Sequence, residues 1–346
     1  MAFQSRLVTP SISSFPCCLV RGLFLVVGVL YQIFKFRLCL SFRSMRLRLI
    51  ILAVVILAIV FSSLMLTRFW SMSGEVGGRS VAVTWGLLGE IVYRLGGGEI
   101  EVVQLLPPGV EIHDWEPAPE TVKEVSRARL LIWTLEGLDD WAQGLAEATG
   151  VESFEAAKRV QLLHTGEEVH GGHTGYDVHF WLNPLNVKIV VEDVAERLAS
   201  EFPDLAPKIR ENAAAFIGEL EAFHQEALEE LRPYRGRIFV TQHDSFRYFA
   251  AAYGLNAIAV LGPEEEEPTP QHLGEVIEVI KGLCIIYAED GVVSPVISSL
   301  SREYGVEVMM LYTGEALTLE DVKAGKGYVY LMRSNIKALV EGFECG

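Results

Sequence analysis

The chain has 346 residues and a formal net charge of −16, and half of its residues are hydrophobic. This length suits two domains with sizeable cores, and so acidic a chain argues against nucleic acid as a partner. The cysteines form no CxxC pair, so they predict neither a disulfide scaffold nor a thiolate metal site; they are Cys17, Cys18, Cys39, Cys284 and Cys345.

The first element along the chain is the apolar segment 49–66 (LIILAVVILAIVFSSLML), which follows a basic stretch that begins at Met45. A basic flank before such a segment is typical of a signal peptide or an N-terminal membrane anchor, and its positive charge places the following chain outside. We therefore expect an extracytoplasmic protein, exported or anchored through residues 45–74. Residues 1–44 are then a start-site extension, or part of a two-span anchor with the apolar residues 23–34.

Strand and helix patterns alternate from residue 79 onward. SVAVTWG, IEVVQLL and RLLIWTL are strand-like, LLGEIVYRLGG has helical spacing, and a further helix is expected to start near Pro119. Strands that alternate with helices predict a mainly parallel sheet with helices packed on it. We expect this first α/β lobe to occupy residues 75–184.

Helical patterns without strands come next. Asn183 and Pro184 suit the N-cap and first position of a helix, and a second helix of about 26 residues would span roughly 40 Å. A helix this long suits a strut between lobes, so we assign residues 185–234 to linking helices. Alternation resumes in residues 235–346. The predicted fold is α/β, with two lobes, each with a mainly parallel sheet flanked by helices, joined by a long rigid helix.

Three histidines lie at boundaries of the predicted elements. His113 follows the strand-like VVQLL, His243 follows RIFVTQ, and His179 precedes the linking helices. Ligands of parallel α/β sheets bind beyond the carboxyl ends of the strands, so facing lobes would bring these imidazoles together across a cleft. Three imidazoles and one oxygen ligand suit tetrahedral zinc. The spacing alone does not separate metal ligands from structural histidines.

The segments around these histidines carry a resemblance to a known family. LLPPGVEIHDWEPAP, DVHFWLNP and TQHDSFRYFAAAYGL closely resemble the metal-site segments of the solute-binding proteins of zinc and manganese ABC importers, the cluster A-I family. The resemblance covers roughly residues 79–342. It implies that His113, His179 and His243 bind a metal ion in the interlobe cleft of a receptor that is not an enzyme.

The same resemblance implies what the receptor does. It would capture Zn²⁺ outside the cytoplasm and deliver it to the permease and ATPase subunits of an ABC importer. Manganese members of the family tend to have a carboxylate at the third position. Because imidazole is a softer ligand than carboxylate, His243 favours Zn²⁺ over Mn²⁺.

The fourth ligand departs from the family pattern, which usually has an acid just after a late strand of the second lobe. In VEVMMLYTGEAL, Gly314 stands at about that position. We expect the neighbouring Glu315 to complete the site, with water or Glu289 as alternatives. Asp114 and Asp244 each follow a predicted ligand and are expected to orient imidazoles or loops.

The other histidines have weaker assignments. Three of them stand in a glycine-rich stretch that looks like a short version of the family's histidine-rich loop; they are His164, His170 and His173. This stretch is either an accessory metal loop or a solvated loop. His224 and His272 are expected at the surface. In YDVHFWLNP, Phe180 and Trp181 are expected to pack into the first lobe and to leave His179 as an exposed imidazole in the cleft.

Other functions remain open at this point. A manganese-binding receptor of the same fold is one alternative. A zinc-dependent hydrolase is another, but the sequence contains no HExxH or HxHxDH cluster, and histidines spread over two lobes suit a clamp better. An adhesin or metal-sensing surface protein on the same fold is the third.

Overall fold

The computed structural model describes residues 78–110, 112, 115–164, 175–262 and 267–345, together with 54, 56 and 57. The chain divides into two units, 1–75 and 76–346, and the second contains both lobes. Apart from three residues, the predicted leader lies outside the described part of the chain. Among the described residues, no helix combines the length and apolar character needed to cross a membrane. The predicted lobe boundaries stay predictions.

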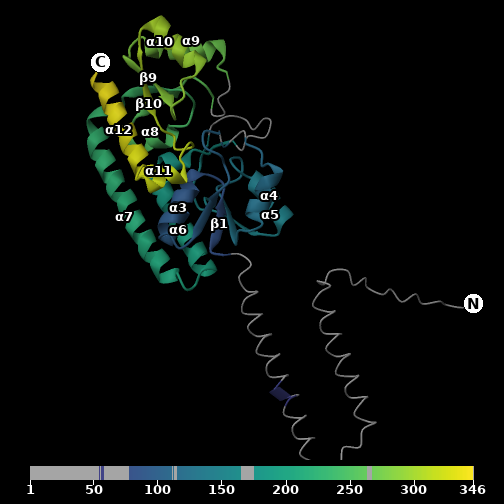
Figure 1. Ribbon diagram of the computed structural model, residues 1–346. Helices are drawn as coiled ribbons and strands as arrows, with labels where there is room; N and C mark the ends of the chain where they lie inside the picture. The colour runs from purple at the N-terminus through teal and green to yellow at the C-terminus, as the bar shows by residue number, and fades with distance from the viewer. Residues whose placement is uncertain are drawn as a thin grey trace, which may run out of the picture. The chain divides into compact units, whose positions relative to one another are not determined.

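The first lobe is built on a four-stranded parallel sheet with the strand order β2-β1-β3-β4. Figure 1 labels β1 of this sheet. Its strands are β1 (Ser80–Val83), β2 (Glu101–Gln104), β3 (Leu130–Trp133) and β4 (Glu152–Glu155). Its helices are α3 (Gly86–Gly96), α4 (Pro119–Val125) and α5 (Trp141–Thr149). Alternate residues of β1 enter different cores: Val81 and Val83 pack with α3, and Ala82 packs with α4 and α5. The sheet is therefore covered on both faces, as expected for parallel strands.

A short antiparallel hairpin and three helical segments connect the lobes. The hairpin pairs β5 (Leu163–His164) with β6 (Tyr176–Asp177), and the 3₁₀ turn η1 (Phe180–Leu182) follows. The linking helices are α6 (Pro184–Glu201) and α7 (Ala206–Leu231). The predicted start of α6 is confirmed, because the Asn183 side chain accepts a hydrogen bond from the backbone N–H of Leu185 and Pro184 opens the helix.

The second lobe repeats the α/β pattern. Its strands are β7 (Ile238–Thr241), β8 (Asn256–Ala259), β9 (Ile285–Glu289) and β10 (Glu307–Leu311). β7 pairs with β8 and β9 with β10, both parallel, and β7 lies beside β9. The helical segments are η2 (Arg232–Tyr234), α8 (Arg247–Tyr253), α9 (Pro270–Ile280), α10 (Pro295–Tyr304), α11 (Leu319–Lys323) and α12 (Tyr328–Glu344). α7 packs against α3, α6 and α12, so one helix contacts both lobes (Figure 1). The predicted two-lobe α/β fold is confirmed.

Tight packing also joins the two lobes near the start of α3. A Cβ atom at Gly86 would overlap the carbonyl oxygen of Leu317, so only glycine fits at this crossing. One turn further along α3, the buried Glu90 accepts a hydrogen bond from the backbone N–H of Tyr328 at 2.7 Å. Burial raises the pKa of Glu90, although the Tyr328 N–H and the guanidinium of Arg94 oppose that shift. A carboxyl group of the first lobe thereby caps the first helical residue of α12 in the second.

Two expectations from the sequence are wrong. Cys284 and Cys345 form a disulfide, with Cα atoms 6.3 Å apart, which links the residue before β9 to the end of α12. The pairing joins residues 61 positions apart, a relation that local spacing does not reveal. His224 is only 8% exposed, because it lies on the face of α7 that packs against Tyr253, and burial lowers its pKa. His272 is half-buried, and its Nε2 lies 2.9 Å from the carbonyl oxygen of Ala259.

Candidate metal centre

His179 follows the hairpin and is held by an acid two residues before it. Asp177 Oδ1 lies 2.9 Å from His179 Nδ1 and also accepts the backbone N–H of His179 at 2.9 Å. With Nδ1 facing this carboxylate, Nε2 is turned the other way and lies 3.7 Å from Glu315 Oε1. The ring is 0% exposed, so the expected open cleft imidazole is a buried one. The indole of Trp181 and the imidazole of His243 both lie against it.

His243 stands just beyond the carboxyl end of β7, as predicted. Its backbone N–H and that of Gln242 donate to Glu289 Oε1 at 3.1 and 2.9 Å, and its Nδ1 faces Glu289 Oε2. Glu289 closes β9, so the end of one strand fixes the loop and the ring that follow another. This contact turns His243 Nε2 away from Glu289. Glu289, named as an alternative ligand, contacts the His243 ring and is placed to orient it.

Glu315 reaches the same place from the loop after β10. Gly314 has φ of +90°, a left-handed conformation that favours glycine, and it turns the chain between Thr313 and Glu315. The carbonyl oxygen of Thr313 accepts a hydrogen bond from the indole N–H of Trp181 at 2.9 Å. The hydroxyl of Thr313 contacts the carboxylate of Asp290. An acid at position 314 itself would be strained, which is a physical reason for the shift of the acid to position 315.

The three side chains converge. One ligand atom from each of His179, His243 and Glu315 lies within 4.8 Å of the others, and all three residues are buried. The two imidazole rings stand edge to face, with centroids 5.3 Å apart. Two nitrogens and one oxygen at this spacing suit a zinc ion. The structure therefore brings together three of the four predicted metal ligands.

The remaining predicted residues are placed differently. His113, Asp114, His170 and His173 lie outside the described residues. His164 is exposed in β5, where its ring contacts that of Tyr176 at 5.1 Å.

Two acids that the sequence did not single out for this role contact the imidazoles. Asp244, which was expected to orient an imidazole or a loop, lies 3.9 Å from Arg247, and burial raises its pKa. The corresponding prediction for Asp114 stays a prediction. Asp177 and Glu289 contact the rings instead. The signals that could have identified them are the Asp-x-His spacing of Asp177 and the position of Glu289 at a strand end.

A buried hydrogen-bond network in the first lobe supports Trp181, the indole that packs against His179. Trp181 packs on Trp85 with ring centroids 4.8 Å apart, and the Trp85 indole donates to Thr134 Oγ1 at 2.7 Å. Asp139, which is 0% exposed, accepts hydrogen bonds from the hydroxyls of Thr84 and Thr134 and from two backbone N–H groups. The network therefore connects the carboxyl ends of β1 and β3 to the indole beside His179.

Asp139 predicts a pH dependence of stability. Burial raises its pKa from 3.8 to about 6, so the folded chain holds a proton that the unfolded chain releases between these values. Stability from this group is therefore greatest at low pH and falls as pH rises through about 6. Between pH 5 and 7.5, the native protein should lose about 1 kcal/mol relative to Asp139→Asn. Urea unfolding of both proteins at both pH values measures this difference, and a pH-independent difference would contradict the assignment.

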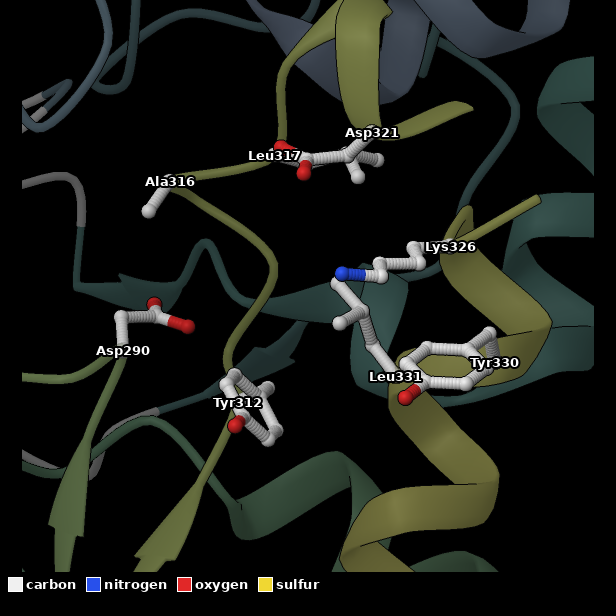
Figure 2. A pocket seen from close by; sticks show the side chains of 8 residues that line it. All are labelled: Asp290, Tyr312, Ala316, Leu317, Asp321, Lys326, Tyr330 and Leu331. Carbon is white, nitrogen blue, oxygen red and sulfur yellow. The ribbon is translucent and has the colours of Figure 1, made fainter. Parts of the chain in front are cut away.

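The loop that carries Glu315 also lines a pocket of about 270 Å³ (Figure 2). The Asp290 carboxylate and the Lys326 ammonium both project into it, the first from the end of β9 and the second from the turn before α12. The other lining residues are Tyr312, Ala316, Leu317, Asp321, Tyr330 and Leu331. The pocket contains none of the three converging ligands, and its polar rim flanks the loop that positions one of them.

Comparison with known proteins agrees with this geometry. The zinc-binding lipoprotein AdcA of Streptococcus pneumoniae is 31% identical over 277 residues, which is 76% of this chain and 55% of that protein. The high-affinity zinc uptake system protein ZnuA of Bacillus subtilis is 27% identical over 256 residues, which is 70% of this chain and 80% of that protein. The chain thus spans little more than half of the AdcA relative.

Solved structures show the same fold. The Zn(II)-bound ZnuA-like domain of S. pneumoniae AdcA superposes with a TM-score of 0.63 and 30% identity, covering 76% of this chain and 98% of that one. The laminin-binding protein Lmb of Streptococcus agalactiae superposes with a TM-score of 0.66 and 28% identity, with the same coverage of both chains. It is described as a bifunctional protein with adhesin and metal-transporting activity. Residues 81–342 match the sequence model of the periplasmic zinc-uptake complex component A. The chain belongs to this zinc-uptake component family, ZnuA, which confirms the resemblance that its three histidine segments carry.

Proposed function

We propose that this protein is an extracytoplasmic receptor that captures Zn²⁺ between its lobes and delivers it to an ABC-type permease. The observation that carries the proposal is the buried convergence of His179, His243 and Glu315 within 4.8 Å. His113 is proposed as the remaining ligand, on the strength of its sequence segment.

The chemistry of the surroundings supports a divalent cation. Glu315 is joined by Asp177 and Glu289, so three buried carboxylates surround two imidazoles. Buried charge is stable when it is paired or coordinates a metal, and carboxylates behind metal-binding imidazoles raise their basicity as ligands. Zn²⁺ suits the imidazole-rich set better than Mn²⁺, which prefers oxygen ligands.

The proposal has a direct test on the full-length protein in mild detergent. Metal analysis should find one tightly bound Zn²⁺ per chain, and calorimetry should give a much weaker affinity for Mn²⁺. His243→Ala should lose the tight site. The matched control is His272→Ala, which removes a histidine of the same lobe outside the converging set. A protein without tight zinc binding, or a His243→Ala variant that binds as tightly as the wild type, would refute the assignment.

The partners and location also belong to the proposal. We propose that residues 49–66 export or anchor the protein, and that permease and ATPase subunits of an importer receive the metal. Deleting the gene should then impair growth in chelator-treated medium, and added Zn²⁺ should restore growth where Mn²⁺ does not. The zinc-hydrolase alternative needs an open coordination position for water. The zinc-loaded protein should accordingly hydrolyse a chromogenic ester no faster than the protein without zinc.

His164, His170 and His173 are proposed as an accessory metal loop outside the tight site. Deleting residues 165–174 should leave one tight Zn²⁺ per chain and change only weak binding or the uptake rate. The expectation follows from the hairpin, because the register pair Leu163 and Asp177 at its base remains in the shortened chain. Calorimetry of the deleted and intact proteins at matched zinc concentrations checks it. Loss of the tight site would mean that the deleted residues include primary ligands.

A further inference from the structure

Helix α8 carries a buried tyrosine whose hydroxyl joins the second lobe to the hairpin of the first. Tyr248 is 4% exposed. Its hydroxyl donates to the backbone carbonyl of Asp177 at 2.7 Å and accepts the backbone N–H of Leu163 at 2.7 Å. Leu163 and Asp177 are register partners in the hairpin, so a single hydroxyl holds both strands at the same level.

The residue held in this way is the one that orients His179. Asp177 Oδ1 contacts both the ring Nδ1 and the backbone N–H of His179, each at 2.9 Å. The position of the Asp177 backbone therefore sets the position of its carboxylate, and the carboxylate sets the direction of the ring. Two short hydrogen-bonded steps connect the Tyr248 hydroxyl to the imidazole of a proposed ligand.

Tyr248 also lies near the other proposed histidine ligand in the sequence, since it follows His243 by five residues. α8 begins at Arg247, four residues after His243, and it packs directly against η1, which follows His179. Helix α8, which follows His243, thus contacts the segment that carries His179. The two imidazoles come from different lobes, so their separation depends on contacts of this kind.

We propose that Tyr248 is a positioning residue for the metal site, which fixes His179 relative to His243 across the two lobes. This inference rests on the proposed zinc-binding function. Groups that hydrogen-bond directly to metal-binding imidazoles, as Asp177 does to His179, typically contribute 10–100-fold to metal affinity, and Tyr248 acts through Asp177. Loss of the Tyr248 hydroxyl should act mainly on dissociation, because most affinity differences between closely related complexes lie in the dissociation rate.

The test compares Tyr248→Phe with Tyr253→Phe in the full-length protein. Tyr253 is on the same helix and 2% exposed, and its hydroxyl has no hydrogen-bond partner within the described chain, so it is a matched control. Y248F should bind Zn²⁺ about tenfold more weakly, the lower end of that range, with faster release to a chelator, whereas Y253F should match the wild type. The visible absorption of Co²⁺ bound in place of Zn²⁺ should change in Y248F only, which a purely structural role would not produce.

The outcomes are distinguishable. If the wild type binds zinc and Y248F retains wild-type affinity, release rate and Co²⁺ spectrum, the positioning role is wrong and the receptor function stands. If the wild type itself binds no zinc, both proposals fall. A third measurement needs no variant: coupling is reciprocal, so Zn²⁺ should slow hydrogen exchange at the Leu163 amide. Exchange there that is unchanged by zinc would overturn the inference even if Y248F failed to fold.

Discussion

His179→Ala should weaken Zn²⁺ binding by several orders of magnitude, because it removes a proposed nitrogen ligand from a site with few donors. It should also lower the stability of the metal-free protein. The imidazole is 0% exposed and faces Asp177, so its removal leaves a buried carboxylate without that contact. Asp177 Oδ1 keeps the backbone N–H of residue 179, so the cost is that of one hydrogen bond to a charged group, about 1.5–3 kcal/mol.

Competition with a chelating dye measures the affinity, and urea unfolding of the metal-free protein measures the stability. His272→Ala is a suitable control, since His272 is a half-buried histidine outside the converging set. If His179→Ala bound Zn²⁺ normally once folded, His179 would be a structural histidine and the proposed site would be wrong.

Trp181→Ala should destabilise the metal-free protein by about 3–5 kcal/mol, the usual cost of removing a fully buried indole. The side chain is 0% exposed and packs between Trp85 and His179. Its N–H holds the carbonyl of Thr313, so the loss also releases the loop that presents Glu315. Zinc affinity should therefore fall as well, as a secondary effect of a looser site.

The comparison variant for Trp181 is Trp141→Ala, which removes a half-buried indole from the outer face of the first lobe. Denaturant unfolding of both variants should show a clearly larger loss for Trp181. A loss below about 1 kcal/mol would show that the surrounding residues collapse into the space. The contacts of the indole with Trp85, His179 and Thr313 would then contribute little to stability.

The regular elements of both lobes were predictable because their signals are local. Alternating strand and helix patterns identified the parallel sheets, and Asn183 with Pro184 marked the start of α6. The β5–β6 hairpin was not predictable, since strands of two residues have no periodicity. The disulfide and the buried face that holds His224 were missed for a related reason: both depend on contacts with distant segments.

The site shows the same division between local and distant information. Motif resemblance and strand ends led to His179 and His243, and the shifted acid led to Glu315. Glu289, which orients His243, lies 46 residues from it, and only the packing of β7 beside β9 brings them together. Tyr248 and Asp177 illustrate the limit further, because a hydrogen bond from a side-chain hydroxyl to a backbone carbonyl leaves no pattern in the sequence.

The crossing of Gly86 with Leu317, together with the Glu90 carboxyl that caps α12, has a kinetic consequence. Hinged receptors release their cargo by swinging apart, a motion that these buried contacts and the 26-residue α7 would resist. If the proposed site holds Zn²⁺, its exchange would proceed through local opening events, whose free energies can be far smaller than that of global unfolding. The residence time of the ion would then depend on how often the Glu315 loop or the hairpin opens. A membrane partner that speeds release would therefore act by deforming one of these two segments, and it would not need to pull the lobes apart.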